Sequence, residues 1–242
     1  MILTILENGP IAKDVWRMRL TRPAGEKGLP GRFLHIRVPG KYLRRPISIA
    51  WTGEDSWDIV YKTVGEGTRR MTALPKGARV DALGPLGNGF DPAKAGGAPL
   101  LLGGGVGVPP LLDLCRALLE KGVRPQAAFG FNTAADAILL ADFRALGIEP
   151  LIATMDGSLG IRGFVTDAAK ALSFDSFFAC GPEPMLRSAL RSFPQSGYLS
   201  LETRMACGIG ACLGCTIETN EGPKRVCKDG PVFAREELRW SI

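Results

Sequence analysis

Four cysteines near the end of the chain have a spacing that could bind iron. Cys207, Cys212 and Cys215 form a C-x4-C-x2-C run, and Cys227 follows after a short interval. This is the plant-type spacing for a [2Fe-2S] cluster, in which four thiolates converge on two iron atoms. Three glycines alternate with the cysteines, and residues without a Cβ let the backbone pass close to the sulfides. The sequence therefore predicts that these four cysteines bind a [2Fe-2S] cluster.

A structural zinc site is the main alternative, because four cysteines also suit tetrahedral zinc. Zinc ribbons usually present two separated C-x2-C pairs, whereas here three ligands share one loop. Disulfides are disfavoured, because the opening sequence MILTILENGPIAKDVWRM is broken by polar residues and by proline and contains no apolar signal segment. We expect reduced cysteines and a cytoplasmic location, where thiols more often bind metal or do redox work.

The composition of the chain excludes several other classes of function. A length of 242 residues suits two small domains and a cluster-binding segment. The net charge of +6 is modest, and no basic stripe interleaved with aromatic residues indicates nucleic acid as a partner. No apolar run approaches the length of a membrane span, so no membrane partner is expected.

The first ninety residues or so have the pattern of an antiparallel barrel. Short segments rich in β-branched and aromatic residues alternate with Gly/Pro turns, which predicts strands without long helices between them. One short helix is expected over residues 68–74, after a glycine pair and before a proline. The expected strands cover residues 2–6, 15–20, 33–38, 47–51, 57–64 and 79–83.

Two segments of this barrel could bind a diphosphate. In RRPISI, Arg45 carries a permanent planar cation, Pro46 fixes the backbone, and Ser48 adds a hydroxyl. In VYKTVGEGTRR, a helix start near Gly67, with Thr68 as a possible cap, would expose backbone N–H groups to an anion. Each segment alone is weak evidence for diphosphate binding, since an exposed arginine and a glycine turn are common surface features.

The single histidine, His35, lies in the strand-like segment RFLHIRV. It has no second histidine or carboxylate pair nearby in the sequence, so a packing or surface role is favoured over catalysis.

From residue 98 to residue 194 the spacing of the apolar residues changes. Strand-like segments at 98–102, 126–131, 149–154 and 175–180 alternate with helical patterns at 109–121, 136–146, 165–172 and 183–190. This alternation predicts a parallel sheet with helices on both faces, which binds ligands at the carboxyl ends of its strands. Cys115 falls on the apolar face of the first helix and is expected in the core.

Two strand ends in this second region could contact a dinucleotide. GGGVGVPP resembles a dinucleotide loop, although Pro109 stands where the G-x-G-x-x-G fingerprint has its third glycine. In FFACGPEPM, Cys180 is a candidate for contact with a nicotinamide ring, and an inert buried thiol is an equally good interpretation. No Ser-Arg or Lys pair follows the strand that ends at Asn132, which favours NAD over NADP.

The motifs RPIS, GEGT, GPLGNGF, GGGVGVPP and CGPEPM, in this order, resemble the ferredoxin-reductase superfamily. In that superfamily a flavin-binding barrel precedes a nicotinamide-binding α/β domain. The terminal segments LETRMACGIGACLGC and RVCKDGPVF narrow the resemblance to the electron transfer subunits of NAD-dependent dihydroorotate dehydrogenases, over almost the whole chain. The implied domains are an FAD-binding barrel (1–93), an NAD-binding α/β domain (94–197) and a [2Fe-2S] segment (198–242).

The resemblance also implies which residues bind the cofactors. Ile47 departs from the wider superfamily, where many members have a flavin-stacking tyrosine, and this shifts the expected ring contact to the backbone and to Tyr61. The expected FAD contacts are Arg45, Pro46, Ile47, Ser48, Val60, Tyr61, Lys62, Gly67 and Thr68. The expected nicotinamide contacts are Gly103, Gly104, Gly105, Gly107, Cys180, Gly181 and Pro182.

The implied function is electron transfer without a catalytic acid or base on this chain. A partner subunit containing FMN would oxidise dihydroorotate, and its electrons would pass singly through the cluster to FAD and then as a hydride to NAD+. Two copies of each subunit would form a heterotetramer in pyrimidine biosynthesis. The alternatives are a flavin and iron-sulfur subunit of an NAD(P)H-ferredoxin or sulfur-linked oxidoreductase, a zinc-stabilised binding module, and a self-sufficient reductase.

Overall fold

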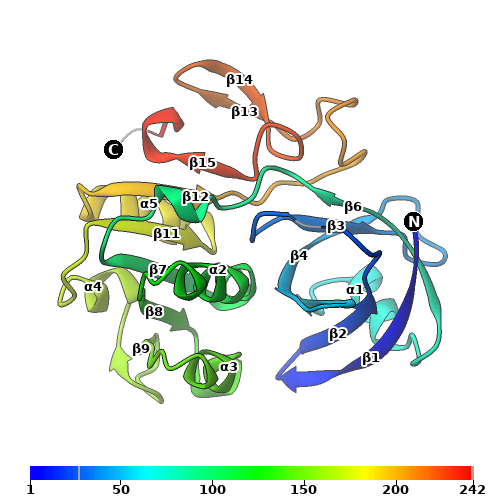
Figure 1. Ribbon diagram of the computed structural model, residues 1–242, viewed down its shortest axis with the longest axis horizontal. Coiled ribbons are helices and arrows are strands. Elements are labelled where there is room, and N and C mark those ends of the chain that lie inside the picture. Colours follow the sequence, from blue (N-terminus) through cyan, green and yellow to red (C-terminus); the bar gives the residue numbers. More distant parts are fainter. Residues whose placement is uncertain (27, 241–242) are drawn as a thin grey trace.

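The computed structural model describes residues 1–26 and 28–240. Figure 1 shows a barrel drawn in blue and cyan, an α/β sheet in green and yellow, and a C-terminal segment in orange and red that extends along one side of both. The predicted fold class, a flavin-type antiparallel barrel followed by a parallel-sheet domain and a cluster segment, is confirmed. None of the described helices combines the length and the apolar character that crossing a bilayer requires.

The barrel closes in the strand order β1-β2-β5-β4-β3-β6. All six predicted strands are present, and β1 continues well past its predicted end at residue 6. Alternation along β3 places Leu34 and Ile36 in the barrel core and Phe33 in a second core on the outside. The strands are β1 (Ile2–Ala12), β2 (Val15–Thr21), β3 (Phe33–Ile36), β4 (Arg45–Thr52), β5 (Ser56–Lys62) and β6 (Arg79–Leu86).

The helix of the barrel, α1 (Glu66–Thr72), begins two residues earlier than predicted. Gly65 is its N-cap, and Thr68 is therefore the third residue of the helix and not the cap. The Thr68 hydroxyl donates to the Gly65 carbonyl at 3.1 Å and accepts from the Gly65 N–H at 3.3 Å. These bonds fix the turn that leads into the helix.

The second sheet has the order β10-β9-β8-β7-β11-β12-β15, and all its pairs are parallel except β12 with β15. Buried, nearly continuous apolar strands form its centre, as expected for a sheet covered on both faces. The strands are β7 (Pro99–Gly104), β8 (Gln126–Phe131), β9 (Leu151–Thr154), β10 (Ile161–Arg162), β11 (Ser176–Cys180), β12 (Ser196–Ser200) and β15 (Val232–Ala234).

Helices cover both faces of this sheet. Leu111 and Phe143 pack with β7 and β8 side chains on one face, and Leu186 and Ala168 pack on the other. The helix predicted over residues 136–146 is shorter, because Leu139 has a positive φ of 60° that prevents an earlier start. The helices are α2 (Pro109–Glu120), α3 (Leu140–Ala145), α4 (Val165–Ala169) and α5 (Glu183–Ser192), with short 3-10 turns at η1 (Pro92–Lys94), η2 (Gly105–Gly107), η3 (Ala134–Asp136) and η4 (Arg235–Glu237).

The C-terminal segment is joined to the α/β sheet. β12 pairs with β11, and the unpredicted β15 adds antiparallel to β12. A hairpin of β13 (Thr216–Thr219) and β14 (Gly222–Arg225) projects beyond this edge (Figure 1). The expected boundary between residues 197 and 198 therefore falls inside β12, and the chain with the four cysteines leaves the sheet after β12 and returns to it at β15.

Barrel and sheet pack directly against each other. Val15, Ala50 and Val60 of the barrel share a core with residues of β7, β8 and α2. Arg17 spans the boundary, with one guanidinium nitrogen 2.7 Å from Asp58 in the barrel and another 2.7 Å from Asp142 in α3. This packing holds the ends of the parallel strands close to the barrel.

Candidate functional site

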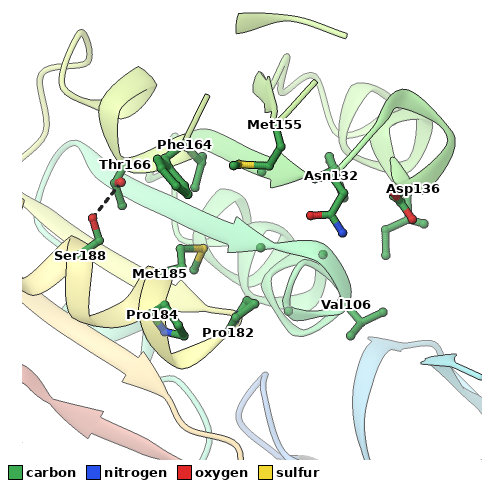
Figure 2. A pocket seen from close by; sticks show the side chains of 18 of the residues that line it. Val106, Asn132, Asp136, Met155, Phe164, Thr166, Pro182, Pro184, Met185 and Ser188 are labelled. Carbon is green, nitrogen blue, oxygen red and sulfur yellow. Dashed lines mark hydrogen bonds between the residues drawn. The ribbon is translucent and has the colours of Figure 1, made fainter. Parts of the chain in front are cut away.

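A cavity of about 650 Å³ opens where the carboxyl ends of the parallel strands meet the barrel. Its walls come from the segments after β7, β8, β9 and β11, and from Val15 and Lys62 of the barrel. The volume is in the range of sites for organic cofactors. Figure 2 shows side chains from several of these segments around one space. The cavity therefore lies where a parallel sheet is expected to bind a ligand.

The glycine loop and the loop after β11 form one wall by close backbone contact. A Cβ on Gly107 would collide with the Cys180 carbonyl and lie 2.5 Å from the Gly181 nitrogen. A Cβ on Gly104 would lie 2.6 Å from the Met185 sulfur and 3.0 Å from Pro182. Only glycine fits at position 107, where the neighbours are backbone atoms, so the two loops can approach each other closely.

The structure brings most of the predicted nicotinamide contacts to this wall. Gly104, Gly105, Gly107, Gly181 and Pro182 all line the cavity. Gly103 and Cys180 do not. The space beside Gly103 is filled by Val108 and Phe129, and the Cys180 side chain is 2% exposed. Burial raises the pKa of the Cys180 thiol, as expected for the inert buried thiol that the sequence left as an alternative.

Several lining residues were not predicted as contacts. Asn132 and Asp136 follow β8, and the position of that strand end could have identified them. Phe164 and Met155 are exposed apolar side chains, at 62% and 44%, that point into the cavity (Figure 2). Glu202 enters from the end of β12. Met155 directly follows β9, so the same strand-end signal could have identified it, whereas no sequence signal marks Phe164 and Glu202.

The charged side chains of the cavity come from both domains. Lys62, predicted as an FAD contact, lies 3.8 Å from Asp136 across the boundary. Asp136 also accepts hydrogen bonds from the Thr133 N–H and hydroxyl, at 3.2 and 3.0 Å. Lys62 and Asp136 thus form an ion pair on the barrel side of the cavity, and Glu202 adds a further carboxyl group to its lining.

The two predicted diphosphate segments meet in space. The Arg45 guanidinium lies so close to Gly67 that a Cβ there would be 2.5 Å from Nε. Arg45 donates to the Leu43 and Arg44 carbonyls, at 2.6 and 3.2 Å, and pairs with no described carboxylate. An unneutralised arginine beside the start of a helix suits a phosphate group. These residues fit the FAD diphosphate that the sequence predicts there.

Replacing Arg45 with alanine is expected to weaken FAD binding about 10- to 100-fold, because a hydrogen-bonded cation is lost from the diphosphate. Fluorescence titration of the flavin-free protein with FAD measures the change. Arg69→Ala is the matched control, since it removes an equal charge from an exposed position on α1. An equal loss of affinity in both variants would mean that only net charge matters.

The remaining flavin positions are split between the two faces of the barrel wall. Tyr61 is 2% exposed, belongs to the barrel core and donates its hydroxyl to Asn8 at 3.0 Å. Its side chain is therefore not available to stack on a flavin outside the barrel, which corrects the expected ring contact. Ile47 is half-buried against the same core. Pro46 and Ser48 alternate with it and lie on the outer face of β4.

Hydrogen bonds from backbone N–H groups to sulfur join the four cysteines in two pairs. Cys207 is hydrogen-bonded through sulfur to the Cys212 N–H at 3.4 Å, and Cys215 to the Cys227 N–H at 3.4 Å. The Gly210 N–H donates to the Cys227 sulfur at 3.1 Å. The first pair lies near the surface, with Cys212 exposed, and the second pair is buried. Two iron atoms, each held by two thiolates, match this pairing.

A backbone donor in the loop favours the thiolate form of Cys207, whereas burial raises the pKa of the Cys227 thiol. The Ile209 N–H lowers the pKa of Cys207 to about 6, although partial burial opposes this. Among residues 1–26 and 28–240, no three cysteine, histidine or acidic side chains surround a single point closely enough to hold one ion. The donor set and its N–H···S bonds thus fit a [2Fe-2S] cluster at the predicted cysteines.

Residues 202–239 match the family described as the iron-sulfur cluster binding domain of dihydroorotate dehydrogenase B. The electron transfer subunit of dihydroorotate dehydrogenase B (NAD(+)) from Bacillus pumilus (strain SAFR-032) is 42% identical, covering 99% of this chain and 98% of that protein. The chain belongs to this family of electron transfer subunits.

Other relatives agree with that membership. The subunit of the same description from Bacillus velezensis is 43% identical over 98% of this chain and 97% of that protein. A solved structure of the NADH-dependent reduced ferredoxin-NADP oxidoreductase superposes with a TM-score of 0.89 and 32% identity, covering 99% of this chain and 90% of that chain. The predicted resemblance is confirmed, and members of the electron transfer subunit family align with the barrel, the cavity and the cysteine loop together.

Proposed function

We propose that this chain transfers electrons between a dihydroorotate-oxidising partner and NAD+, through a [2Fe-2S] cluster and FAD. The observation that carries the proposal is the seating of the cysteine loop on the outer face of β3, next to β4 with its predicted flavin contacts. Phe33 of β3 shares a core with Cys215 and Cys227. The predicted cluster and flavin sites are therefore neighbours within one folded unit.

When bound, the cluster supplies one-electron transfer and FAD supplies the conversion of two single electrons into a hydride. The net reaction converts dihydroorotate and NAD+ into orotate, NADH and a proton. The residues of this chain position the cofactors and shield them. Arg45 and Gly67 hold the diphosphate of FAD, and the close contact of Gly107 with Gly181 shapes the nicotinamide side of the cavity. None of these steps needs an acid or base from this chain.

The surface of the cysteine loop supports a partner at the cluster. Ile209 and Leu213 are 55% and 62% exposed and stand on either side of the exposed Cys212. Exposed apolar side chains around a redox centre are typical of a docking surface. We propose that an FMN-containing catalytic subunit covers this loop, in a heterotetramer of two copies of each subunit, in the cytoplasm. The mass of the purified complex tests the stoichiometry.

A second candidate has a specific observation in its favour. The solved oxidoreductase structure superposes over 99% of this chain, so the same three sites could serve an NAD(P)H-ferredoxin type of complex. Both candidates use the same residues here, and the partner distinguishes them.

Purification of the chain from its native cells with its bound proteins tests the choice. A partner that reduces NAD+ with dihydroorotate only in the presence of this chain supports the proposed function. A ferredoxin-linked partner without dihydroorotate activity would replace it with the second candidate.

We expect NADH to reduce the bound flavin at least about tenfold faster than NADPH at equal concentration, since removal of one well-placed charge contact changes affinity by this order. Asp136 lines the cavity after β8. A carboxylate at this place accepts a hydrogen bond from a ribose hydroxyl of NADH and repels the 2′-phosphate of NADPH. Stopped-flow reduction by the two dinucleotides measures the ratio. Asp136→Asn should narrow it, and an NADPH preference in the unchanged protein would contradict the assignment.

A further inference from the structure

The only histidine of the sequence is completely buried on the outer face of β3. His35 is 0% exposed, and neither of its ring nitrogens has a hydrogen-bond partner of good geometry among the described residues. Buried polar atoms in folded proteins nearly always have such partners. A fully buried imidazole without partners therefore needs an explanation.

His35 lies between the cysteine loop and the strand with the predicted flavin contacts. Its backbone is the register partner of Pro46 in β4, so the two residues share the outer face of the barrel. Phe33, two residues earlier, contacts the His35 ring edge-on with centroids 6.5 Å apart and packs into the core of the buried cysteine pair. One side of His35 is thus fixed by the barrel.

The other side of His35 faces the first cysteine of the cluster loop. A Cβ on Gly208 would collide with Nδ1 and lie 3.1 Å from Cε1 of the ring. Gly208 has a φ of +73°, which favours glycine and brings the backbone of the loop onto the imidazole. The Cys207 carbonyl belongs to the same peptide group as the Gly208 nitrogen and is therefore next to this contact. An imidazole has at least one ring N–H to donate.

We propose that His35 is a positioning residue for electron transfer, whose ring N–H bonds to the Cys207 backbone carbonyl and ties the cluster loop to the flavin strand. This inference rests on the proposed function, because the tie matters only when cluster and flavin exchange electrons. It explains the buried donor and the need for glycine at 208. A functional site keeps its geometry when packing and hydrogen bonds from the surrounding residues hold it in place.

Two replacements at position 35 separate hydrogen bonding from packing. His35→Leu fills space but cannot donate, whereas His35→Asn places an amide N–H near the position of Nδ1. Ile36→Val is the matched control, because it trims a buried side chain of the same strand on the barrel-core side. Each variant is purified with its cofactors, and its iron, sulfide and FAD contents are measured.

Three readouts follow for each variant. When EDTA is added, the visible iron-sulfur absorbance should disappear about tenfold faster in His35→Leu than in the unchanged protein. One buried hydrogen bond changes an equilibrium by about this factor. Reduction of the cluster after NADH addition should be about tenfold slower by the same reasoning, with a changed EPR spectrum. Flavin reduction by NADH should stay within about twofold, because the nicotinamide cavity is untouched.

His35→Asn is expected to restore all three readouts, and Ile36→Val to leave the cluster readouts unchanged. The proposal is overturned if His35→Leu matches the unchanged protein in cluster loss and cluster reduction, or if His35→Asn is as impaired as His35→Leu. If His35→Leu does not fold, the comparison of His35→Asn with Ile36→Val decides in the same way. Failure of the proposed function would appear differently. The unchanged protein would then not couple dihydroorotate oxidation to NAD+ reduction, while the variants would still differ in cluster loss and cluster reduction.

Discussion

Replacing Cys212 with serine is expected to remove the [2Fe-2S] cluster while FAD stays bound. Cys212 is the exposed member of the outer sulfur pair with Cys207, so its loss leaves one iron atom with a single protein thiolate. A lost ligand should lower cluster affinity by more than the roughly 10- to 100-fold known for supporting residues around metal sites. Arg45 and Gly67 belong to the barrel, and the flavin site should therefore survive.

Iron and sulfide analysis, the visible spectrum and EPR of the reduced protein measure this loss, and flavin released by acid measures FAD. Cys115→Ala is the matched control. Cys115 is a completely buried core residue of α2, and burial raises its thiol pKa to about 12. Its replacement should leave the cluster in place. A full iron-sulfur signal in Cys212→Ser would remove Cys212 from the ligand set, and a signal lost from Cys115→Ala would implicate general unfolding.

Replacing Gly107 with alanine is expected to slow the reaction with NADH strongly while leaving the cluster and FAD bound. The new methyl group would overlap the Cys180 carbonyl and lie 2.5 Å from the Gly181 nitrogen, so the glycine loop must move away from the loop after β11. Because both loops line the nicotinamide cavity, a displacement of this kind should slow hydride transfer about 100-fold. Steady-state NADH oxidation with an artificial electron acceptor measures the rate.

Gly122→Asn controls for general damage to the α/β domain. Gly122 follows the far end of α2, has a φ of +76° that asparagine tolerates, and has no atom within 4 Å of an added Cβ. This variant should keep its NADH activity. Unchanged NADH oxidation in Gly107→Ala would show that the close contact of the two loops is not needed for nicotinamide binding.

Much of the fold was predictable because its signals are local. Alternating apolar residues and Gly/Pro turns identified all six barrel strands, and β8 was predicted at its observed bounds of Gln126–Phe131. Errors arose where a single backbone angle decided the outcome, as at Leu139, whose positive φ shortens α3. β15 was missed, because three residues with no pattern of their own become a strand only by pairing with β12.

The sequence by itself was enough to predict the cluster ligands and the glycine loops. Three of the four cysteines share one short loop, so covalent spacing alone limits what they can bind. Only the tertiary structure decided which residues surround the nicotinamide cavity, since Lys62, Phe164 and Glu202 come from three segments that folding brings together. It also turned Tyr61 into the barrel core and placed His35 beneath the cysteine loop. Side-chain direction and contacts between distant segments depend on packing, which local spacing does not encode.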